Sequence, residues 1–533
     1  MNKVSIFFGH VAGNVGDIAI NEGEHRLLRA AFPDAHLQFV TLRAAKSQFI
    51  DFAMPSMQLD DNTSVVHFMP QSINATGYVA APETFLEACT ASDADLIVLA
   101  AGEHVFSYAN NTNTFNLFWR TLPLYVAKRL GIAVISMPAT YGPFETSPGA
   151  ELARLVAKMA DDFSVRDVAS STEIADLVAE PVLVRPDPAF WLTSVRAKRQ
   201  SGLYVFAMRS EGWGIRLNKA LRDESTEQFS QDNYRDSLAF QYNLAVAKEI
   251  LATSGSRITF AIQTLADEEL SASVVKALAD DYPGRVSLYR PTSIADYLLL
   301  LGSAQCVITS RFHAVIMAIV SGTPAIASYF PVHGHKMPGL LALLDSKKHC
   351  VEITPDNLQQ AVLQSVEVLA ATCNMLPVAN AKLQQLRTEY IANLSHVVIT
   401  SADSADVLKM SDILVRLAAE LMLEGIQASQ NKVSRQHASR LKVVQADTKN
   451  LQKRLDASVE DLNVYKNKST QTVQQLQKEQ SVLEQKLKDS LQQLELLTRR
   501  EVSMKEQNAF FQELYEDAKA ESQRLKRMLG IPI

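Results

Sequence analysis

The chain has 533 residues, which is more than one hydrophobic core usually organises, so two or three domains are expected. Its formal net charge of -6, with 21% charged residues, argues against a general nucleic-acid partner. The four cysteines (Cys89, Cys306, Cys350 and Cys373) lack the spacing of metal ligands or of a disulfide framework, so no metal site is predicted and a reducing compartment fits best.

Short apolar runs alternate with helical patterns in the first part of the chain. The runs are VSIFF (4–8), HLQFVTL (36–42), SVVHFM (64–69), DLIVLAA (95–101), IAVISM (132–137) and FSVRD (163–167), with a helix expected over Asn113–Leu130. This alternation predicts βα units and a mostly parallel sheet. The pattern pauses near residue 196, so residues 1–195 are interpreted as an N-terminal Rossmann-like domain.

The same rhythm restarts in residues 196–376, which predict a second Rossmann-like domain. Its apolar runs are LYVFAMR (203–209), RITFAIQ (257–263), VSLY (286–289), CVITS (306–310) and PAIASY (324–329), with helices expected near 233–253 and from Ser293. Two such α/β domains would face a cleft, in a GT-B-like arrangement. Ligands of such folds lie outside the carboxyl ends of the strands.

The last part of the chain predicts a helical connector over 377–430 and a coiled coil over 431–529. One heptad position holds mostly leucine, and the second core position is poorer, with Val459, Leu487 and Leu494 but also Lys466. The members of the first position are Leu441, Leu455, Leu462, Leu476, Leu483, Leu497, Met504, Phe511 and Leu525. The apolar residues at these two heptad positions predict that helices of several copies of the chain pack together as a homo-oligomer. The alternative is a single charged helix.

The stretch ITSRFHAVIMAIVSGTPAIASYF (308–330) places two polar residues at the start of an apolar helix. The pattern predicts Ser310 as N-cap and a helix to about Ser321. Arg311 and His313 then lie in the first turn, where the helix dipole favours an anion. Either these side chains bind a phosphate or carboxylate, or Arg311 pairs with a carboxylate of the other domain and His313 caps the helix.

This stretch resembles the signature of the polysaccharide pyruvyl transferase family, in which a strand precedes Arg-x-His-Ala and a small-residue helix ends in Gly-x-Pro. Four other segments are similar to that family in the right order, over about residues 4–345. They are GHVAGNVGDIAINEG (9–23), SVRDVASSTEI (164–174), PDPAFWL (186–192) and YFPVHGHKMPGLL (329–341). One segment departs from the family: LAAGEHVFSY (99–108) stands where many members have a run of glycines.

The resemblance implies transfer of a pyruvyl group from phosphoenolpyruvate to two hydroxyls of a sugar, with no cofactor besides that donor. Cations at strand ends suit the doubly anionic donor, and a histidine suits proton transfer near neutral pH. The predicted catalytic residues are His313 and Arg311, with His335 or His104 for the other proton transfer. The predicted donor-binding residues are Arg209, Arg311, Ser310 and Lys336, and the predicted acceptor-binding residues are Gly13, Asn14, Gly16, Asp17, Glu103 and His104.

Bland interpretations of these residues stay open. The loop at 13–17 also fits a tight turn with Asp17 capping the next helix, and Arg166 with Asp167 fits a structural ion pair. A glycosyltransferase that uses a nucleotide sugar, and a non-catalytic scaffold with a transferase-like body, are the alternative functions. No apolar run is long enough to cross a bilayer, so a cytoplasmic protein with at most peripheral membrane contact is expected.

Overall fold

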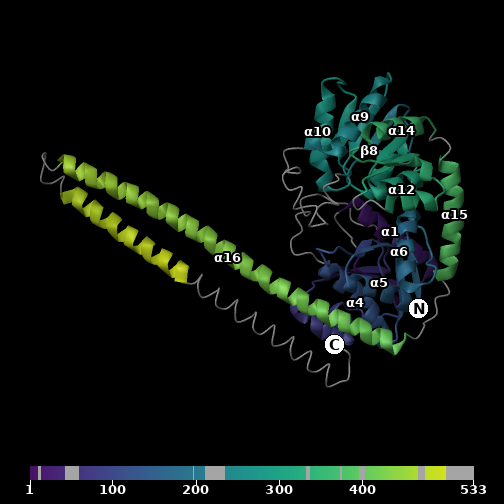
Figure 1. Cartoon of the computed structure of the whole chain (residues 1–533), viewed down its shortest axis with the longest axis horizontal. Helices are drawn as coiled ribbons and strands as arrows, with labels where there is room; N and C mark the ends of the chain where they lie inside the picture. The colour runs from purple at the N-terminus through teal and green to yellow at the C-terminus, as the bar shows by residue number, and fades with distance from the viewer. Residues whose placement is uncertain are drawn as a thin grey trace. The chain divides into compact units, whose positions relative to one another are not determined.

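The computed structural model describes residues 1–9, 14–42, 59–195, 197–209, 234–331, 336–371, 375–394, 402–465 and 474–499. The chain divides into two compact units, Met1–Met422 and Leu423–Ile533. Figure 1 labels their main helices. Both sheets belong to the first unit.

The first sheet has seven strands, all paired in parallel, in the order β3-β2-β1-β4-β6-β5, and β7 also pairs with β6. The strands are β1 (Lys3–Phe7), β2 (His36–Leu42), β3 (Thr63–Phe68), β4 (Leu96–Leu99), β5 (Glu103–Ser107), β6 (Ala133–Phe144) and β7 (Asp162–Val165). The helices are α1 (Val15–Ala31), α2 (Ala75–Ala80), α3 (Pro82–Ala88), α4 (Thr114–Leu130), α5 (Ser147–Met159) and α6 (Val168–Val178), with short 3₁₀ turns η1 (Ser72–Asn74) and η2 (Pro188–Trp191). Strand β5 was not predicted, because its polar start, Glu103 and His104, interrupts the apolar run.

The second sheet has six parallel strands in the order β10-β9-β8-β11-β12-β13. They are β8 (Leu203–Ala207), β9 (Arg257–Ala261), β10 (Val286–Tyr289), β11 (Cys306–Thr309), β12 (Ala325–Tyr329) and β13 (Cys350–Glu352). The helices are α9 (Leu238–Ala252), α10 (Glu268–Ala279), α11 (Ile294–Ser303), α12 (Phe312–Val320), α13 (Lys336–Leu343) and α14 (Leu358–Ala371), with 3₁₀ turns η3 (Tyr234–Asp236), η4 (Leu265–Asp267) and η5 (Lys347–His349). The two Rossmann-like α/β sheets predicted from the sequence are therefore confirmed. The expected boundary residue, 196, lies outside the described residues.

A shared apolar core joins the two α/β domains. Helix α1 and η2 of the first domain pack with α12 of the second, and α15 (Met375–Leu394) packs against both α1 and α12 (Figure 1). The approach of η2 to α1 is close, because a Cβ at Gly23 would lie 1.9 Å from the carbonyl oxygen of Pro188. Position 23 thus needs glycine if the two segments are to touch.

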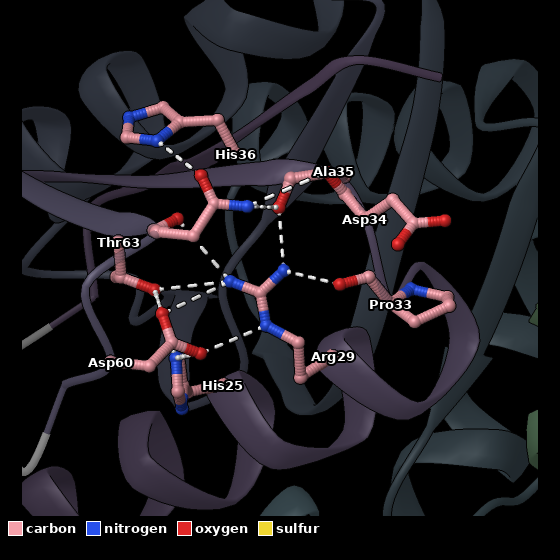
Figure 2. Close-up of polar contacts among 9 residues, drawn as sticks. His25, Arg29, Pro33, Asp34, Ala35, His36, Asp60 and Thr63 are labelled. Atoms are coloured by element: carbon pink, nitrogen blue, oxygen red, sulfur yellow. Dashed lines mark hydrogen bonds and ion pairs between the residues drawn. The ribbon is translucent and has the colours of Figure 1, made fainter.

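Arg29, near the end of α1, ties the helix to the chain around β2 and β3 (Figure 2). Its Nε and Nη2 donate to the two carboxylate oxygens of Asp60, at 2.9 and 3.1 Å, and its Nη1 donates to the carbonyls of Pro33 and Ala35. Asp60 also accepts from the hydroxyl of Thr63 at 2.6 Å. One guanidinium therefore fixes three segments of the first domain.

The first part of α16 (Ser404–Tyr465) packs into the core of the first domain. Its buried side chains recur every three or four residues and share a cluster with α2 to α5: Met410, Ile413, Leu414, Leu417, Ala418 and Leu421. This spacing is that of an amphipathic helix with one apolar face. No helix among the described residues combines the length and hydropathy that crossing a bilayer requires.

The second unit contains the rest of α16 and a helix over 474–499. The less exposed side chains again follow a spacing of three and four: Val444, Thr448, Leu451, Leu455 and Ser458 in α16, and Leu476, Gln480, Leu483, Leu487, Ser490, Leu494 and Leu497 in the other helix. Val459 was predicted for the second core position but is 37% exposed. The buried residue there is its neighbour, Ser458. The residues at the second core position of the heptad therefore follow a different spacing in the two helices. The coiled coil itself stays a prediction, and its last heptads, with Met504, Phe511 and Leu525, lie outside the described residues.

Candidate active site at the start of α12

Helix α12 begins one residue later than predicted. Its N-cap is Arg311, in extended backbone, and Ser310 instead bridges two strand ends. The Oγ of Ser310 accepts from the amide of Arg209 at 2.7 Å, and the amide of Arg311 donates to Oγ1 of Thr309 at 2.9 Å. Ser310 therefore holds the end of β8 beside the end of β11, which brings Arg209 and Arg311 to the same edge of the sheet.

The first two amides of α12 are open. Arg311 accepts from the amides of Ala314 and Val315, but no acceptor for the amides of Phe312 or His313 lies among the described residues. Such unpaired N–H groups, together with the helix dipole, favour an anion. The start of α12 therefore has the chemistry of an anion site.

The start of α1 differs, because its first amides already have partners. Asn14 is the N-cap, its side chain accepts from Gly16 at 2.9 Å, and its carbonyl accepts from Asp17 and Ile18. The amide of Val15 donates to the carbonyl of Gln263 in the second domain at 3.2 Å. The cap is thus Asn14 rather than Asp17, and Gly13 lies outside the described residues.

Arg311 is paired within its own domain. Its Nη2 contacts the buried carboxylate of Asp267 and donates to Oγ1 of Thr264 at 3.0 Å. Its Nε is buried without a hydrogen-bond partner among the described residues. Of the two interpretations of Arg311, pairing with a fixed carboxylate is therefore the one that the structure shows, but the partner comes from the same domain and not from the other one. Asp267 lies in η4, which follows β9, and β8 separates β9 from β11 in the sheet.

Arg209 and Lys336 add two more cations at this edge. Burial, and then the nearby charge of Arg311, lower the pKa of Arg209 to about 10, against the attraction of Glu103 and Asp267. Burial also lowers the pKa of Lys336 to about 8, although its ion pair with Glu103 opposes that change. Glu103, predicted for the acceptor, and Lys336, predicted for the donor, thus contact each other across the two domains.

His313 is enclosed by residues of the first domain. Its Nε2 lies 3.6 Å from Oδ2 of Asp187 and 3.4 Å from Nη1 of Arg166. Arg166 and Asp187 form a fully buried ion pair at 2.7 Å, so the predicted pair of Arg166 with Asp167 is wrong. Asp167 instead caps α6, where its side chain accepts from the amide of Ser170.

Gly16 lies directly against the imidazole of His313. A Cβ at position 16 would be 2.6 Å from Nδ1 of His313 and 2.8 Å from Nε2 of Gln263. The ring of Phe312, the residue that precedes His313, faces two cations, with Cζ of Arg166 4.6 Å and Nζ of Lys336 5.9 Å from its centroid. The start of α12 is therefore packed between glycine, aromatic and cationic groups.

Several residues of this site had no predicted role: Asp187, Gln263, Thr264, Asp267 and Phe312. Gln263 and Thr264 lie two and three residues after the end of β9, and this position near a strand end was the sequence signal that could have indicated them. Asp267 looked like an ordinary helix-start residue before α10. Of the predicted residues, the side chain of His104 and all of His335 lie outside what the structure describes.

Comparison with known proteins identifies the family. The family model described as polysaccharide pyruvyl transferase matches residues 14–329, while no curated protein matches the chain. Among solved structures, ADP-heptose lipopolysaccharide heptosyltransferase II from E. coli is 14% identical, with 72% of this chain and 99% of that chain covered and a TM-score of 0.36. The UDP-GlcNAc 2-epimerase from Neisseria meningitidis is 10% identical, with 78% and 100% covered and a TM-score of 0.42. Since the family model spans more than half of its length, this chain belongs to the polysaccharide pyruvyl transferase family.

Proposed function

We propose that the protein transfers the pyruvyl group of phosphoenolpyruvate to two hydroxyls of a sugar in a polysaccharide or glycan precursor. The two hydroxyl oxygens form bonds to the central carbon of the donor, the carbon–oxygen bond to phosphate breaks, and inorganic phosphate leaves. The two hydroxyls together lose two protons. The vinyl carbon gains one proton and becomes a methyl group, and the other proton leaves with phosphate. The product is a cyclic ketal, and its formation needs no oxidant or reductant.

The observation that carries this proposal is the pair of arginines beside the open start of α12. Burial, and after it the charge of Arg311, lower the pKa of Arg209, so the two like charges repel each other. A ligand with a phosphate and a carboxylate relieves that repulsion and accepts from the amides of Phe312 and His313. Lys336 supplies a third cation, and Ser310 fixes the strand end that carries Arg209.

His313 is the proposed proton-transfer group, because it is the titratable residue that follows Arg311 in the first turn. The acceptor is proposed to approach from the first domain, past Gly13, Asn14, Gly16 and Asp17, with Glu103 and His104 at the neighbouring strand. Glu103 connects the two sides of the site through Lys336. We place the reaction in the cytoplasm, where phosphoenolpyruvate is made.

The test is release of inorganic phosphate from phosphoenolpyruvate by the full chain, with a panel of free, nucleotide-linked and lipid-linked sugars. Release should depend on the acceptor and be lost in Arg311→Ala and His313→Ala. Arg257→Ala is the matched control, because Arg257 is an exposed arginine at the opposite end of a strand in the same sheet. Phosphate release that is acceptor-independent, or thermal stabilisation by nucleoside diphosphates and none by phosphoenolpyruvate, would contradict the proposal.

A further inference from the structure

The turn that follows β9, residues 263–267, contacts the first domain at its first residue. The backbone carbonyl of Gln263 accepts from the amide of Val15 at 3.2 Å, and its side-chain Nε2 donates to Oδ1 of Asn14 at 3.3 Å. Asn14 is the N-cap of α1, and Val15 is the first residue of that helix. Gln263 belongs to the second domain and is only 2% exposed, so both bonds lie inside the contact between the two domains.

The rest of the same turn holds Arg311. Nη2 of Arg311 donates to Oγ1 of Thr264 at 3.0 Å and contacts the carboxylate of Asp267. These two partners are one and four positions after Gln263 in the chain. The guanidinium that is proposed to bind the donor is therefore positioned by a turn that also contacts the first domain.

Hydrogen bonds within the turn join its two ends. The amide of Asp267 donates to the carbonyl of Thr264 at 3.0 Å, and the amide of Thr264 donates to Oδ2 of Asp267 at 3.1 Å. This reciprocal pattern is that of a capping box, which fixes the backbone at the start of a helix. A displacement of Gln263 therefore moves both partners of Arg311 with it.

The turn is attached on both of its sides. The amide of Ile262 donates to the carbonyl of Tyr289 at 2.9 Å, which fixes the root of the turn on the second sheet. The attachment to the first domain needs glycine at position 16, because a Cβ there would lie 2.8 Å from Nε2 of Gln263 and 2.6 Å from Nδ1 of His313. Any side chain at that position would push α1 away from the turn.

We propose that Gln263 is a positioning residue for donor binding, which transmits the docking of α1 to Arg311 through the turn 263–267. The inference rests on the proposed function, in which Arg311 binds phosphoenolpyruvate and the start of α1 faces the acceptor. Contact with the first domain, on the acceptor side, thereby sets the geometry of the donor side. Donor affinity depends on that contact even when no acceptor is bound.

Gln263→Ala tests this role, because it removes the side-chain bond to Asn14 and keeps the backbone bond from Val15. Titration calorimetry with phosphoenolpyruvate and without acceptor measures donor binding alone. We expect the Kd to rise about three- to tenfold, which is the effect of one lost hydrogen bond between uncharged groups. In turnover, the KM for the donor should rise while kcat stays within about twofold. An unchanged Kd in the folded variant would overturn the proposal.

Asn14→Ser tests the same bond from the first domain. Serine is a good N-cap and still accepts from the amide of Gly16, but it is too short to keep the bond to Gln263 as well. The Kd should rise as in Gln263→Ala, and the double variant should bind no more weakly than either single one. Additive effects would mean that the two residues act separately, against the proposal. Asn14→Ser also decides the question if Gln263→Ala does not fold.

Gln305→Ala is the matched control. The side chain of Gln305 also makes one hydrogen bond, from the amide of Gly202 at 2.8 Å, but at the opposite ends of the strands that carry Arg209 and Arg311. Its loss should leave the Kd for phosphoenolpyruvate unchanged. A Kd that rises as much as in Gln263→Ala would show that the effect is not specific to the turn.

The surroundings of Arg311 are also measured without any ligand. With ¹⁵N-labelled arginine, and Arg311→Lys to assign the signal, the Nε–H resonance of Arg311 should shift in Gln263→Ala and Asn14→Ser but not in Gln305→Ala. The same resonance position in all three variants would contradict the inference. If the wild-type chain binds no phosphoenolpyruvate, the proposed function fails, while this spectrum still tests the connection between α1 and Arg311.

Discussion

Arg311 and Asp267 form an ion pair inside the second domain, and the side chain of Asp267 is only 1% exposed. This carboxylate holds the guanidinium by Nη2, and Thr264 shares the same nitrogen. Asp267→Asn is therefore expected to leave Arg311 mispositioned, to raise the KM for phosphoenolpyruvate and to destabilise the chain by about 2 kcal/mol. Steady-state kinetics and thermal unfolding measure the two effects.

Glu268→Gln is the control for this change, because Glu268 is the next residue and pairs with the largely exposed Arg290. Its effect on stability should stay within about 0.5 kcal/mol, and its effect on KM should be negligible. A lower KM in Asp267→Asn would mean that Asp267 competes with the donor instead of orienting Arg311.

Donor affinity should fall as the pH rises through about 8. Burial lowers the pKa of Lys336 to about that value, so the lysine is charged below pH 8 and loses its charge above it. An anionic donor binds the charged form, so the apparent Kd for phosphoenolpyruvate should rise up to about tenfold per pH unit above the pKa. Titration calorimetry between pH 7 and 10 measures this, and Lys336→Arg should remove the dependence because a guanidinium keeps its charge.

A substitution of Glu103 tests whether Lys336 is the group that makes donor affinity depend on pH. Its negative charge raises the pKa of Lys336 against burial, so Glu103→Gln should lower that pKa further. The loss of affinity should then begin at a lower pH than in the wild type. Glu87→Gln, an exposed substitution in the same domain, should leave the profile unchanged. A shift toward higher pH in Glu103→Gln would contradict the assignment of the titrating group to Lys336.

The two sheets were predictable because each strand carries its own local signal. Runs such as LYVFAMR and CVITS are apolar on both faces, as strands covered by helices on both sides must be, and the structure contains β8 and β11 there. Strand β5 lacked that signal, since its first residues are polar. The strand β13, three residues long, was also too short to be recognised.

The site was predictable only where it lies on one segment. Arg311 and His313 stand out because charged groups begin an apolar helix, but their partners come from distant segments. Asp187 is 126 positions away from His313 by residue number, and only the packing of η2 against α1 and α12 brings it there. No local sequence pattern indicates a contact between residues so far apart in the chain. Arg166 was therefore assigned to its sequence neighbour Asp167 instead of to Asp187.

The Arg29–Asp60 contact should make stability depend on acidic pH. Partial burial raises the pKa of Asp60, but hydrogen bonds from Thr63 and Arg29 and the charges of His25 and Arg29 bring it down to about 2. The contribution is therefore complete above the usual aspartate pKa and is lost as the pH falls toward 2. Since the side chain of Asp60 is 40% exposed, we expect Asp60→Asn to cost only about 1 kcal/mol at pH 7.

Urea unfolding of Asp60→Asn and wild type at several pH values measures this difference. Asp34→Asn is the control, because Figure 2 shows the carboxylate of Asp34 pointing away from Arg29. If Asp60→Asn destabilises the chain as much at pH 3 as at pH 7, the effect comes from the fit of the side chain and not from its charge.

The docking of α16 on the first domain should depend on its buried face. Leu414 is 0% exposed, whereas Leu408 on the same helix is 66% exposed. Leu414→Ala should cost about 2–5 kcal/mol through lost burial and the cavity it leaves, and Leu408→Ala should stay within about 0.5 kcal/mol. Equal effects of the two substitutions, measured by chemical unfolding, would argue that α16 does not pack on this core in solution.

Removal of residues 423–533 should separate assembly from chemistry. Every described residue of the proposed site lies in the unit Met1–Met422, so the truncated chain should keep the kcat for phosphate release within about twofold of the full chain. The heptad spacing of the removed part predicts that it joins copies of the chain, so the mass measured by light scattering should fall from that of an oligomer to that of one chain. A monomeric full chain would contradict the predicted self-association, while a truncated chain that folds but releases no phosphate would show that the second unit contributes to the site.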